Sequence, residues 1–488
     1  MRQHIGRQFA TSQISIGAED SLASSTGLDD LVDFRPTAVA EVELQFGLKS
    51  LLETSAYRTT DFDVSTRPAL VLVRLHSHPL GLANLNLASR NPRGPWSEIV
   101  TKLFGQSIAD HLKNVDGFGD CAAFDVWDGH PPATLECLAD RRHLLSSAPF
   151  VSVIIATRER TDKLARCLDS LKRLAYPKFE VLVVDNCRET DCTERVVRAY
   201  ADGKIGIRYL REDERGLGAA HNRGLSEARG DIVAFTDDDV EVDQHWLAEL
   251  AAPFLSTPGV GGVTGLILPG ELETPAQVML ESHGRFSKGF LPRDIDLEKN
   301  RPADRLFPFT VGRLGSGANM AFETAFLRGI GGFDPALGTG TSARGGDDLA
   351  ALFRLLVAGR TLAYRPGAIV WHYHHREVGA VVNQADGYGV GLGAYLTSVG
   401  LRKPRVAASM FSRLPAATLY AWRHSSASTV SDGDISSVLE GTVPQWTNAL
   451  GRRQMRGILK GPTAYMKSCA VHWQYRFRNK CAAPICHD

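Results

Sequence analysis

Three consecutive aspartates, Asp237, Asp238 and Asp239, follow the short apolar run IVAFT. Neighbouring carboxylates raise the free-energy cost of ionising one another, so such a run needs compensation. A hard divalent cation, bound by carboxylate oxygen and shared with the phosphates of a ligand, would provide it. A solvated acidic turn is the alternative. An EF-hand is excluded, because its loop would have Val242 at the glycine position and Ala248 at the glutamate position.

A second acidic pair, Asp347 and Asp348, ends the glycine-rich segment 315–348 and opens the segment DDLAALFRLLVAG. Acids in the first turn of a helix ordinarily complement its dipole, and we expect one of the pair to do so. For the other we predict a general base, since a carboxylate in a crevice beside a metal can take a proton from a hydroxyl.

Three histidines follow in AIVWHYHHRE, at positions 372, 374 and 375. Most histidines are structural, and we expect two of these to be so. His372 comes directly after the apolar run AIVW. We therefore predict that it is a third metal contact at the end of a strand.

The surrounding sequence alternates between strand-like and helix-like segments. Apolar runs rich in Val and Ile lie at 151–157, 179–186, 205–212 and 231–239. Segments with helical spacing lie between them, at 161–174, 193–203 and 217–230. This alternation predicts an α/β domain with a parallel sheet, helices on both faces, and a ligand crevice beyond the carboxyl ends of the strands.

Further polar residues fall at these predicted strand ends. Asp185 closes the run VLVVD, where it either caps the next loop or accepts hydrogen bonds from a nucleotide base; we favour the second interpretation. Thr157, Arg158 and Arg160 follow the first strand, and the two arginines suit phosphate oxygens, although they could be ordinary loop residues. Neither a P-loop nor a G-x-G-x-x-G motif is present at this position.

Charge and cysteine usage limit the possible partners. Lys plus Arg equals Asp plus Glu at 55 each in 488 residues, so no nucleic-acid partner is indicated. The eight cysteines show no C-x-x-C spacing, which favours reduced thiols and a cytoplasmic protein. No apolar run approaches the roughly 18 residues of a membrane span, and the N-terminus lacks the apolar run of a signal peptide.

The C-terminal part is basic. From Gly387 onward there are 13 Lys and Arg against four acids, and residues 452–480 mix cations with Met, Ile, Leu, Tyr and Trp. This composition is typical of a helix at the inner face of a membrane, although the segment could equally pack on the catalytic domain.

The same features predict four segments. We expect a loose tail at 1–31, an accessory α+β domain at 32–147, a catalytic domain at 148–376 and a helical region at 377–488. In the accessory domain we expect a strand with a Pro-Gly turn at 69–81 and a helix at 96–115, and no chemical motif. In the catalytic domain, segment 271–307 is expected to be an irregular loop, and SARGGDD a segment that closes on bound donor.

An ordered set of motifs resembles a known family. VSVIIATRER, LVVDN, GLGAAHNRG, the triple Asp, GANMAF, GGFDPALGTGT, GGDD and WHYH are similar to those of the family 2 glycosyltransferases of the GT-A fold, over about residues 149–376. The resemblance implies a Rossmann-like domain that binds a nucleoside-diphosphate sugar, with UDP-sugars favoured. It implies an inverting transfer that depends on Mn²⁺ or Mg²⁺. The acceptor would be a glycan, a lipid-linked molecule or a small molecule.

The resemblance also implies donor contacts. By position in the motifs, Thr157 and Asp185 would hold the nucleotide. Gly218, Ala219 and Asn222 would contact the nucleotide-sugar.

The acidic residues carry over in the same way. Asp237 and Asp238 are similar to residues that touch ribose, while Asp239 and His372 are similar to metal ligands. Asp348 corresponds to the catalytic base. Its neighbour Asp347 stands where the family usually has Glu, and the shorter side chain leaves its role open.

Two other functions remain open from the sequence. A sugar-phosphate nucleotidyltransferase shares the fold, but it would need glycines after the first strand, where this chain has ATRER. A non-catalytic sugar-binding or nucleotide-binding protein is the third possibility.

Overall fold

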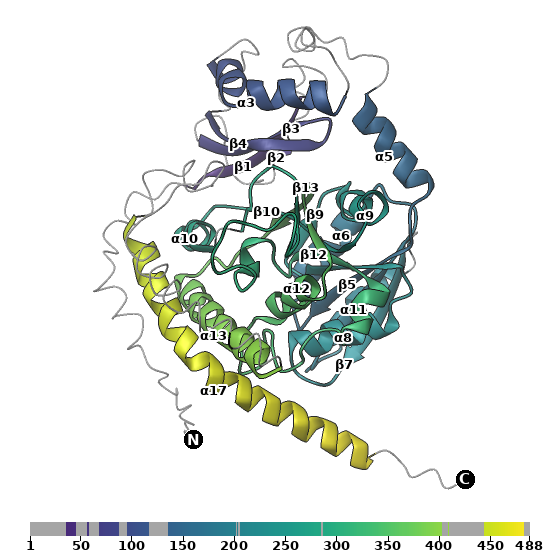
Figure 1. The fold of residues 1–488 in the computed structure, drawn as a ribbon, viewed down its shortest axis with the longest axis vertical. Helices are drawn as coiled ribbons and strands as arrows, with labels where there is room; N and C mark the ends of the chain where they lie inside the picture. Colours follow the sequence, from purple (N-terminus) through teal and green to yellow (C-terminus); the bar gives the residue numbers. More distant parts are fainter. Residues whose placement is uncertain are drawn as a thin grey trace, which may run out of the picture.

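The structure is a computed structural model (Figure 1). It describes residues 36–44, 56–57, 68–86, 95–116, 135–201, 203, 205–284, 286–402, 408 and 444–482. The tail predicted at 1–31 lies outside these residues.

The central element among the described residues is a nine-stranded sheet with the order β11-β13-β10-β12-β8-β5-β6-β7, in which β9 pairs with β13. The strands are β5 Val151–Thr157, β6 Phe179–Asn186, β7 Gly206–Glu212, β8 Ile232–Asp237, β9 Val240–Val242, β10 Val260–Pro269, β11 Arg293–Ile295, β12 Asn319–Glu323 and β13 Thr361–His372. The four strands from β5 to β8 are parallel, as predicted. β12, which the sequence analysis did not place in the sheet, runs antiparallel between β8 and β10, so the complete sheet is mixed.

Both faces of this sheet are buried, which explains the unbroken apolar runs of its strands. Side chains of successive strand residues point to opposite faces. Val153 and Ile155 therefore pack with helices α6 Thr161–Leu171 and α9 Trp246–Ser256 on one face. Ile154 lies in the core of the other face, which includes residues of α8 Leu217–Glu227 and α12 Asp347–Val357. Helix α7 Cys192–Ala201 packs beside α6.

A smaller sheet precedes this domain and has the order β2-β1-β3-β4. Its strands are β1 Ala38–Glu43, β2 Ala56–Tyr57, β3 Pro68–Leu75 and β4 His78–Asn86. One face is covered by α3 Pro95–Asn114, a helix that was predicted at 96–115. The other face packs on the large sheet, where Leu70 and Leu72 contact the cluster that contains Trp371. Helix α5 Glu136–Ser146 then leads into β5.

The turn in this small sheet differs from the prediction. The reversal lies at His76 and Ser77, between β3 and β4, and Pro79 and Gly81 belong to β4. Pro79 and Gly81 are favoured in turns, but here the cross-strand pairing of β3 and β4 decides the position of the turn.

Segment 271–307 also differs from the predicted loop, since it contains α10 Pro275–Gly284 and β11. Residues 276–282 of α10 are all buried. A helix that is buried all round has no polar face, so its sequence shows little helical periodicity.

Two helices complete the described chain, α13 Val378–Arg402 and α17 Pro444–Ala482, which lie side by side in Figure 1. They approach closely at small residues. A Cβ atom on Gly393 would lie 2.2 Å from the Ile458 carbonyl oxygen, and one on Gly461 would lie 2.3 Å from the Gly393 carbonyl carbon. None of the described helices is both long and apolar enough to cross a bilayer.

Candidate active site

The register of the sheet brings the predicted strand-end residues to one edge. Thr157 pairs with Asp185 across β5 and β6, and Ala156 pairs with Asp237 across β5 and β8. The chain then turns back through β9, which pairs with the end of β13 and places His372 opposite Val240. The aspartates and His372, more than 130 positions apart in the chain, therefore meet at the same edge.

Asp239 is surrounded by cationic side chains from the end of β13, from α6 and from the residue before α6. Its carboxylate lies 3.2 Å from Nε2 of His372, 3.0 Å from Nζ of Lys163 and 3.5 Å from Nη1 of Arg160. Burial opposes ionisation, but these three neighbours hold the pKa of Asp239 well below its usual value. Burial alone would lower the pKa of His372, but the Asp239 carboxylate raises it above its usual value.

Asp238 points in a different direction. Only 4% of its surface is exposed, and it accepts hydrogen bonds from Thr157 Oγ1 at 2.6 Å and Arg160 Nη1 at 3.1 Å. Burial raises its pKa. These contacts connect the end of β8 to the end of β5. Asp238 therefore positions the turn between β8 and β9.

Asp237 lies with Asp239 and His372 in a group that could hold a cation. One side-chain ligand atom from each of the three lies within 4.8 Å of the others. Nδ1 of His372 is buried without a hydrogen-bond partner among the described residues. Burial and the Asp239 charge raise the pKa of Asp237 to about 6. Two carboxylates and an imidazole are donors that a divalent transition metal accepts, so the residues present fit such an ion.

The acidic pair at the start of α12 divides into two environments. Asp347 is 3% exposed, with Oδ2 3.4 Å from Nδ1 of His221. Asp348 accepts hydrogen bonds from the backbone N–H groups of Gly317 at 2.9 Å and Leu349 at 2.8 Å. Burial and the neighbouring Asp347 raise the pKa of Asp348 to about 6. Asp348 is therefore the member of the pair that can exchange a proton near neutral pH.

A short chain of contacts connects Asp348 to the triple aspartate. Asp348 is held by Gly317, the next residue Ala318 accepts a hydrogen bond from Thr236 Oγ1 at 2.9 Å, and Asp237 follows Thr236. His221 interacts electrostatically with both Asp237 and Asp348. His221 therefore lies near both acidic groups.

Asp185 is fully buried and accepts a hydrogen bond from Tyr209 Oη at 2.9 Å. Its Oδ1 forms no hydrogen bond among the described residues, although the Thr193 side chain is near enough to oppose the rise in the pKa of Asp185. Burial raises its pKa. A buried acceptor without a donor is costly, which favours a ligand N–H at this position.

The other predicted donor contacts have internal partners. Arg158 Nε donates to the Cys187 carbonyl at 3.2 Å, and its guanidinium pairs with Glu189, while Arg160 pairs with the aspartates rather than lying free for phosphate. Both polar groups of the Asn222 side chain bind the backbone of Phe333.

The two small residues near Asn222 serve packing in this structure. A Cβ on Gly218 would lie 2.6 Å from the Asp334 carbonyl oxygen, and Ala219 is 5% exposed. Together with Asn222, they hold α8 against the loop that leads to Asp348.

Sequence reasoning missed Lys163 and His221. Lys163 lies three positions after Arg160, at the start of α6, and residues three apart share a helix face, which could have revealed it. His221 lies within GLGAAHNRG and is 2% exposed, and only the fold brings it to the acidic pair. Among the later histidines, His374 lies 2.7 Å from Oε2 of Glu281 in α10, a buried internal pair.

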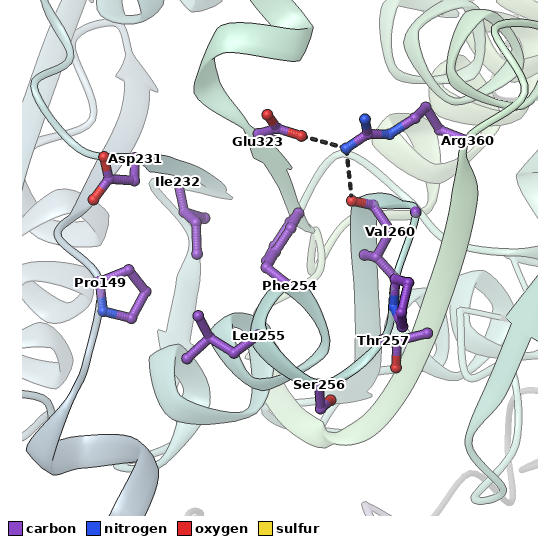
Figure 2. Close-up of a pocket in the computed structure, with 12 residues that line it drawn as sticks. Pro149, Asp231, Ile232, Phe254, Leu255, Ser256, Thr257, Val260, Glu323 and Arg360 are labelled. Carbon is purple, nitrogen blue, oxygen red and sulfur yellow. Dashed lines mark hydrogen bonds and ion pairs between the residues drawn. The ribbon is translucent and has the colours of Figure 1, made fainter.

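A separate hollow of about 430 Å³ lies at the amino ends of β8 and β10, opposite the candidate site (Figure 2). Its edge carries the ion pair of Arg360 with Glu323, and Arg360 also donates to the Val260 carbonyl. Ligands of open α/β sheets bind beyond the carboxyl ends of strands, so this hollow is not the candidate site.

Comparison with known proteins agrees with this geometry. Residues 152–315 match the model of glycosyl transferase family 2. The chain contains a family 2 glycosyltransferase domain. The match includes Thr157, Asp185 and the triple aspartate, and it ends before Asp347. The mixed sheet of this domain has a GT-A-like strand order.

Three relatives illustrate the similarity. The chain is 38% identical over 125 residues to glycosyltransferase AglE of Haloferax volcanii, covering 25% of this chain and 40% of AglE. It is 30% identical over 230 residues to a pre-mycofactocin glycosyltransferase of Mycobacterium tuberculosis, and the match covers 47% of this chain and 43% of that relative. The chain thus spans less than half the length of these relatives. A mannosyltransferase from Pyrobaculum calidifontis, solved with GDP-Man and Mn²⁺, aligns with a TM-score of 0.42 at 20% identity. The alignment covers 64% of this chain and 87% of the mannosyltransferase chain.

Proposed function

We propose that this protein transfers a sugar from a nucleoside-diphosphate sugar to an acceptor hydroxyl, with inversion and with Asp348 as general base. The main support is the placement of Asp348. Two backbone N–H groups hold its carboxylate at the edge that carries the triple aspartate, and its pKa is raised to about 6. A base with a pKa near the working pH is well matched to proton transfer from a hydroxyl.

In the proposed reaction the Asp348 carboxylate accepts the proton of the acceptor hydroxyl. The hydroxyl oxygen forms a bond to the anomeric carbon while the bond from that carbon to the diphosphate oxygen breaks. One displacement inverts the anomeric configuration. Asp347, which lies beside His221, raises the pKa of Asp348 and so strengthens that base.

The donor would bind beyond the ends of β5 and β6. We propose that the free Oδ1 of Asp185 accepts a hydrogen bond from an N–H of the base. Thr157 and Asp238 would lie near the ribose, whereas we assign Asp237 to the cation because its carboxylate lies with Asp239 and His372. Gly218, Ala219, Asn222 and Arg158 have internal contacts, so we give them a supporting role. A UDP-sugar remains our favoured donor.

Asp237, Asp239 and His372 would hold a divalent cation. Carboxylates suit Mg²⁺ and Mn²⁺, and the imidazole favours a transition metal, so Mn²⁺ fits this set better. When bound, the ion would neutralise charge on the departing diphosphate. Arg160 and Lys163 reach the same carboxylate and are well placed to move onto donor phosphates.

The direct test incubates the full protein and Mn²⁺ with a panel of nucleoside-diphosphate sugars and hydroxyl acceptors. We expect one donor to be consumed, and NMR to show a product of opposite anomeric configuration. Retained configuration would contradict the proposed mechanism. Release of pyrophosphate during incubation with a nucleoside triphosphate and a sugar phosphate would instead support a nucleotidyltransferase. Ligand binding without turnover would support a non-catalytic protein.

We also propose that residues 32–147, 148–376 and 377–488 act as an accessory unit, a catalytic domain and a C-terminal helical region. The separate small sheet and the paired helices α13 and α17 support this division. The accessory unit packs on β10 and β13, where Leu268 and Trp371 lie near the carboxyl ends of these strands.

The basic C-terminal region supports a membrane-proximal acceptor. Exposed apolar residues of α17 recur at positions that fall within about 40° around the helix axis. They are Met455, Leu459, Met466, Trp473 and Phe477. Arg452, Arg456 and Lys467 lie beside this stripe. We propose that this face of α17 contacts an anionic lipid surface.

Vesicle sedimentation tests this contact. We expect binding to vesicles with anionic lipid, weaker binding in high salt, and loss of binding in Trp473→Ser/Phe477→Ser. Val471→Ser is the matched control, because Val471 is 63% exposed on α17 but lies off the stripe. Equal binding by the double variant would exclude this face. A concentration-dependent dimer without vesicle binding would assign the face to a second copy.

A further inference from the structure

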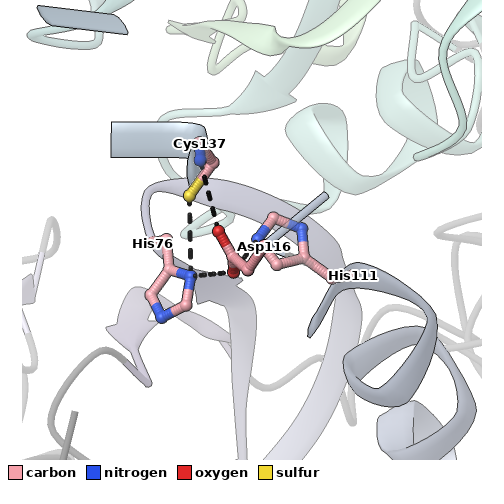
Figure 3. A group of neighbouring side chains, drawn as sticks. All are labelled: His76, His111, Asp116 and Cys137. Carbon is pink, nitrogen blue, oxygen red and sulfur yellow. Dashed lines mark hydrogen bonds and ion pairs between the residues drawn. The ribbon is translucent and has the colours of Figure 1, made fainter. Parts of the chain in front are cut away.

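The accessory unit contains a compact group of four side chains, His76, His111, Asp116 and Cys137 (Figure 3). His76, Asp116 and Cys137 are 2%, 4% and 6% exposed, and the His111 side chain is 9% exposed. One ligand atom of each lies within 4.8 Å of the others. We propose that these four residues form a structural Zn²⁺ site, separate from the candidate active site.

The spacing between the side chains suits a shared ion. Ligands about 2.0–2.3 Å from a tetrahedral Zn²⁺ lie about 3.3–3.7 Å from one another. Here His76 Nδ1 is 2.9 Å from Asp116 Oδ2, His111 Nε2 is 3.3 Å from the same oxygen, and Cys137 Sγ is 3.7 Å from His76 Nδ1. Small adjustments would place all four around one centre.

Hydrogen bonding alone leaves part of this group unsatisfied. His111 Nε2 is buried and forms no hydrogen bond among the described residues, although Asp116 Oδ2 is close. Buried polar atoms normally have a partner. A cation at the centre would give this nitrogen a partner and would bind the same carboxylate oxygen.

The backbone supports the same interpretation. His76 and Ser77 form the two-residue turn between β3 and β4 with φ angles of 52° and 70°. Such turns favour Asn and Gly, and left-handed backbone in other residues has a free-energy cost. At the end of α3, the N–H groups of Val115 and Asp116 both bind the His111 carbonyl, which brings Asp116 back beside His111.

The donor set selects the ion and its role. A thiolate and two imidazoles favour Zn²⁺ over Mg²⁺ or Ca²⁺, which prefer oxygen. Four protein ligands fill a tetrahedral site and leave no open position for substrate, so the site is structural rather than catalytic.

The site would connect three segments that meet the catalytic domain. It would join the β3–β4 turn, the end of α3 and the first turn of α5. Two residues before His76, Arg74 binds Asp243 at 2.7 Å, and Arg141 of α5 donates to Glu249 at 3.1 Å. Bound Zn²⁺ would therefore hold the accessory unit in position on the domain that carries the triple aspartate.

The test uses the full chain, stripped with a chelator and reloaded with Co²⁺ as a spectroscopic substitute for Zn²⁺. We expect thiolate-to-cobalt charge-transfer absorption in the wild type and its loss in Cys137→Ser. Cys167→Ala is the control and should keep the band, because Cys167 lies beside the other candidate cation position and donates to the Asp237 carbonyl at 3.5 Å.

The metal content of the purified protein is a second measurement. It tests the proposal even if Cys137→Ser does not fold. The purified wild type and Asp239→Ala should each retain roughly one Zn²⁺ per chain at the accessory unit. His111→Gln and Asp116→Asn, checked for folding by circular dichroism, should bind Zn²⁺ about tenfold more weakly or worse. A folded wild type without the cobalt band, or a band unchanged in Cys137→Ser, would overturn the proposal.

Discussion

At the residue scale, three adjacent aspartates acquire three different properties from their neighbours. Neighbouring cations lower the pKa of Asp239, and Asp238 is buried and accepts hydrogen bonds from Thr157 and Arg160. Asp237 has a pKa raised to about 6. The chain itself therefore supplies much of the positive charge that the run of acids requires. A bound cation or diphosphate would have to rearrange Arg160 and Lys163.

Asp348→Asn should abolish sugar transfer with little effect on folding. Loss of the base should lower kcat by roughly 10²- to 10⁴-fold. The amide removes a destabilising buried charge but cannot accept from both Gly317 and Leu349, and these effects oppose each other. The free energy of unfolding should therefore change by less than about 1 kcal/mol. Asp213→Asn, at an exposed position, is the control, and normal turnover by the Asp348 variant would disprove the base assignment.

The pH dependence of kcat reports on the same carboxyl. Because the pKa of Asp348 is raised to about 6 by burial and by Asp347, activity should fall as the pH drops through about 6. His221 and Tyr395 also face this group. Asp347→Asn removes a negative neighbour, so the midpoint of the profile should move to lower pH. A midpoint that does not move would show that another group limits the rate.

Lys163→Met should increase the affinity of the site for Mn²⁺. The ammonium lies 3.0 Å from Asp239 and is partly exposed, so its removal should strengthen binding about three- to tenfold, less in high salt. Calorimetric titration without donor measures this change. Lys172→Met, which loses an exposed pair with Asp169 and a cation–π contact with Tyr200, should bind Mn²⁺ as the wild type does. Weaker binding by the Lys163 variant would contradict the inferred competition.

At the element scale, the sequence predicted the elements whose signal is local. The runs VSVIIAT and FEVLVVDN became β5 and β6 with the predicted bounds, since β-branched residues buried on both faces specify such strands. The antiparallel position of β12 and the contacts of Asn222 depend on partners far along the chain, and periodicity contains no such information. The four-residue group around Asp116 was missed for the same reason.

The contact between α13 and α17 depends on glycine. Gly461→Ala would place a Cβ 2.3 Å from the backbone of Gly393, and the helices would have to separate. We expect a loss of about 1–3 kcal/mol in urea unfolding. Gly451→Ala, in the same helix with nothing within 4 Å, should instead be neutral or stabilising by up to about 1 kcal/mol. Equal effects of the two substitutions would argue against close packing at Gly461.

At the scale of the whole molecule, a buried ion pair joins the accessory unit to the catalytic domain. Arg74 lies 2.7 Å from Asp243 and 3.0 Å from Glu41, and its side chain is 8% exposed. Burial opposes ionisation of Asp243, but Arg74 lowers its pKa. Removing one partner of such a pair leaves a buried charge without compensation.

Arg74→Met should therefore lower the free energy of unfolding by about 3–5 kcal/mol. Arg74→Met/Asp243→Asn should recover part of the loss, because the second change removes the stranded charge. Arg376→Met breaks the pairs of an exposed guanidinium with Glu271 and Glu273 and should cost less than about 1 kcal/mol for each pair. A small effect at Arg74 would show that the two units are not coupled through this pair.

The last described helix supports the loop that precedes Asp348 and the loop that precedes α8. Tyr465 donates to Asp334 at 2.9 Å, Ser468 accepts from the backbone N–H of Ala343 at 3.1 Å, and His472 pairs with Glu214. On the ribosome, α17 is made after everything it supports. A nascent chain can thus complete the sheet and its triple aspartate before these loops have their anchors, and the loop before Asp348 is expected to take its final form only once α17 has been made.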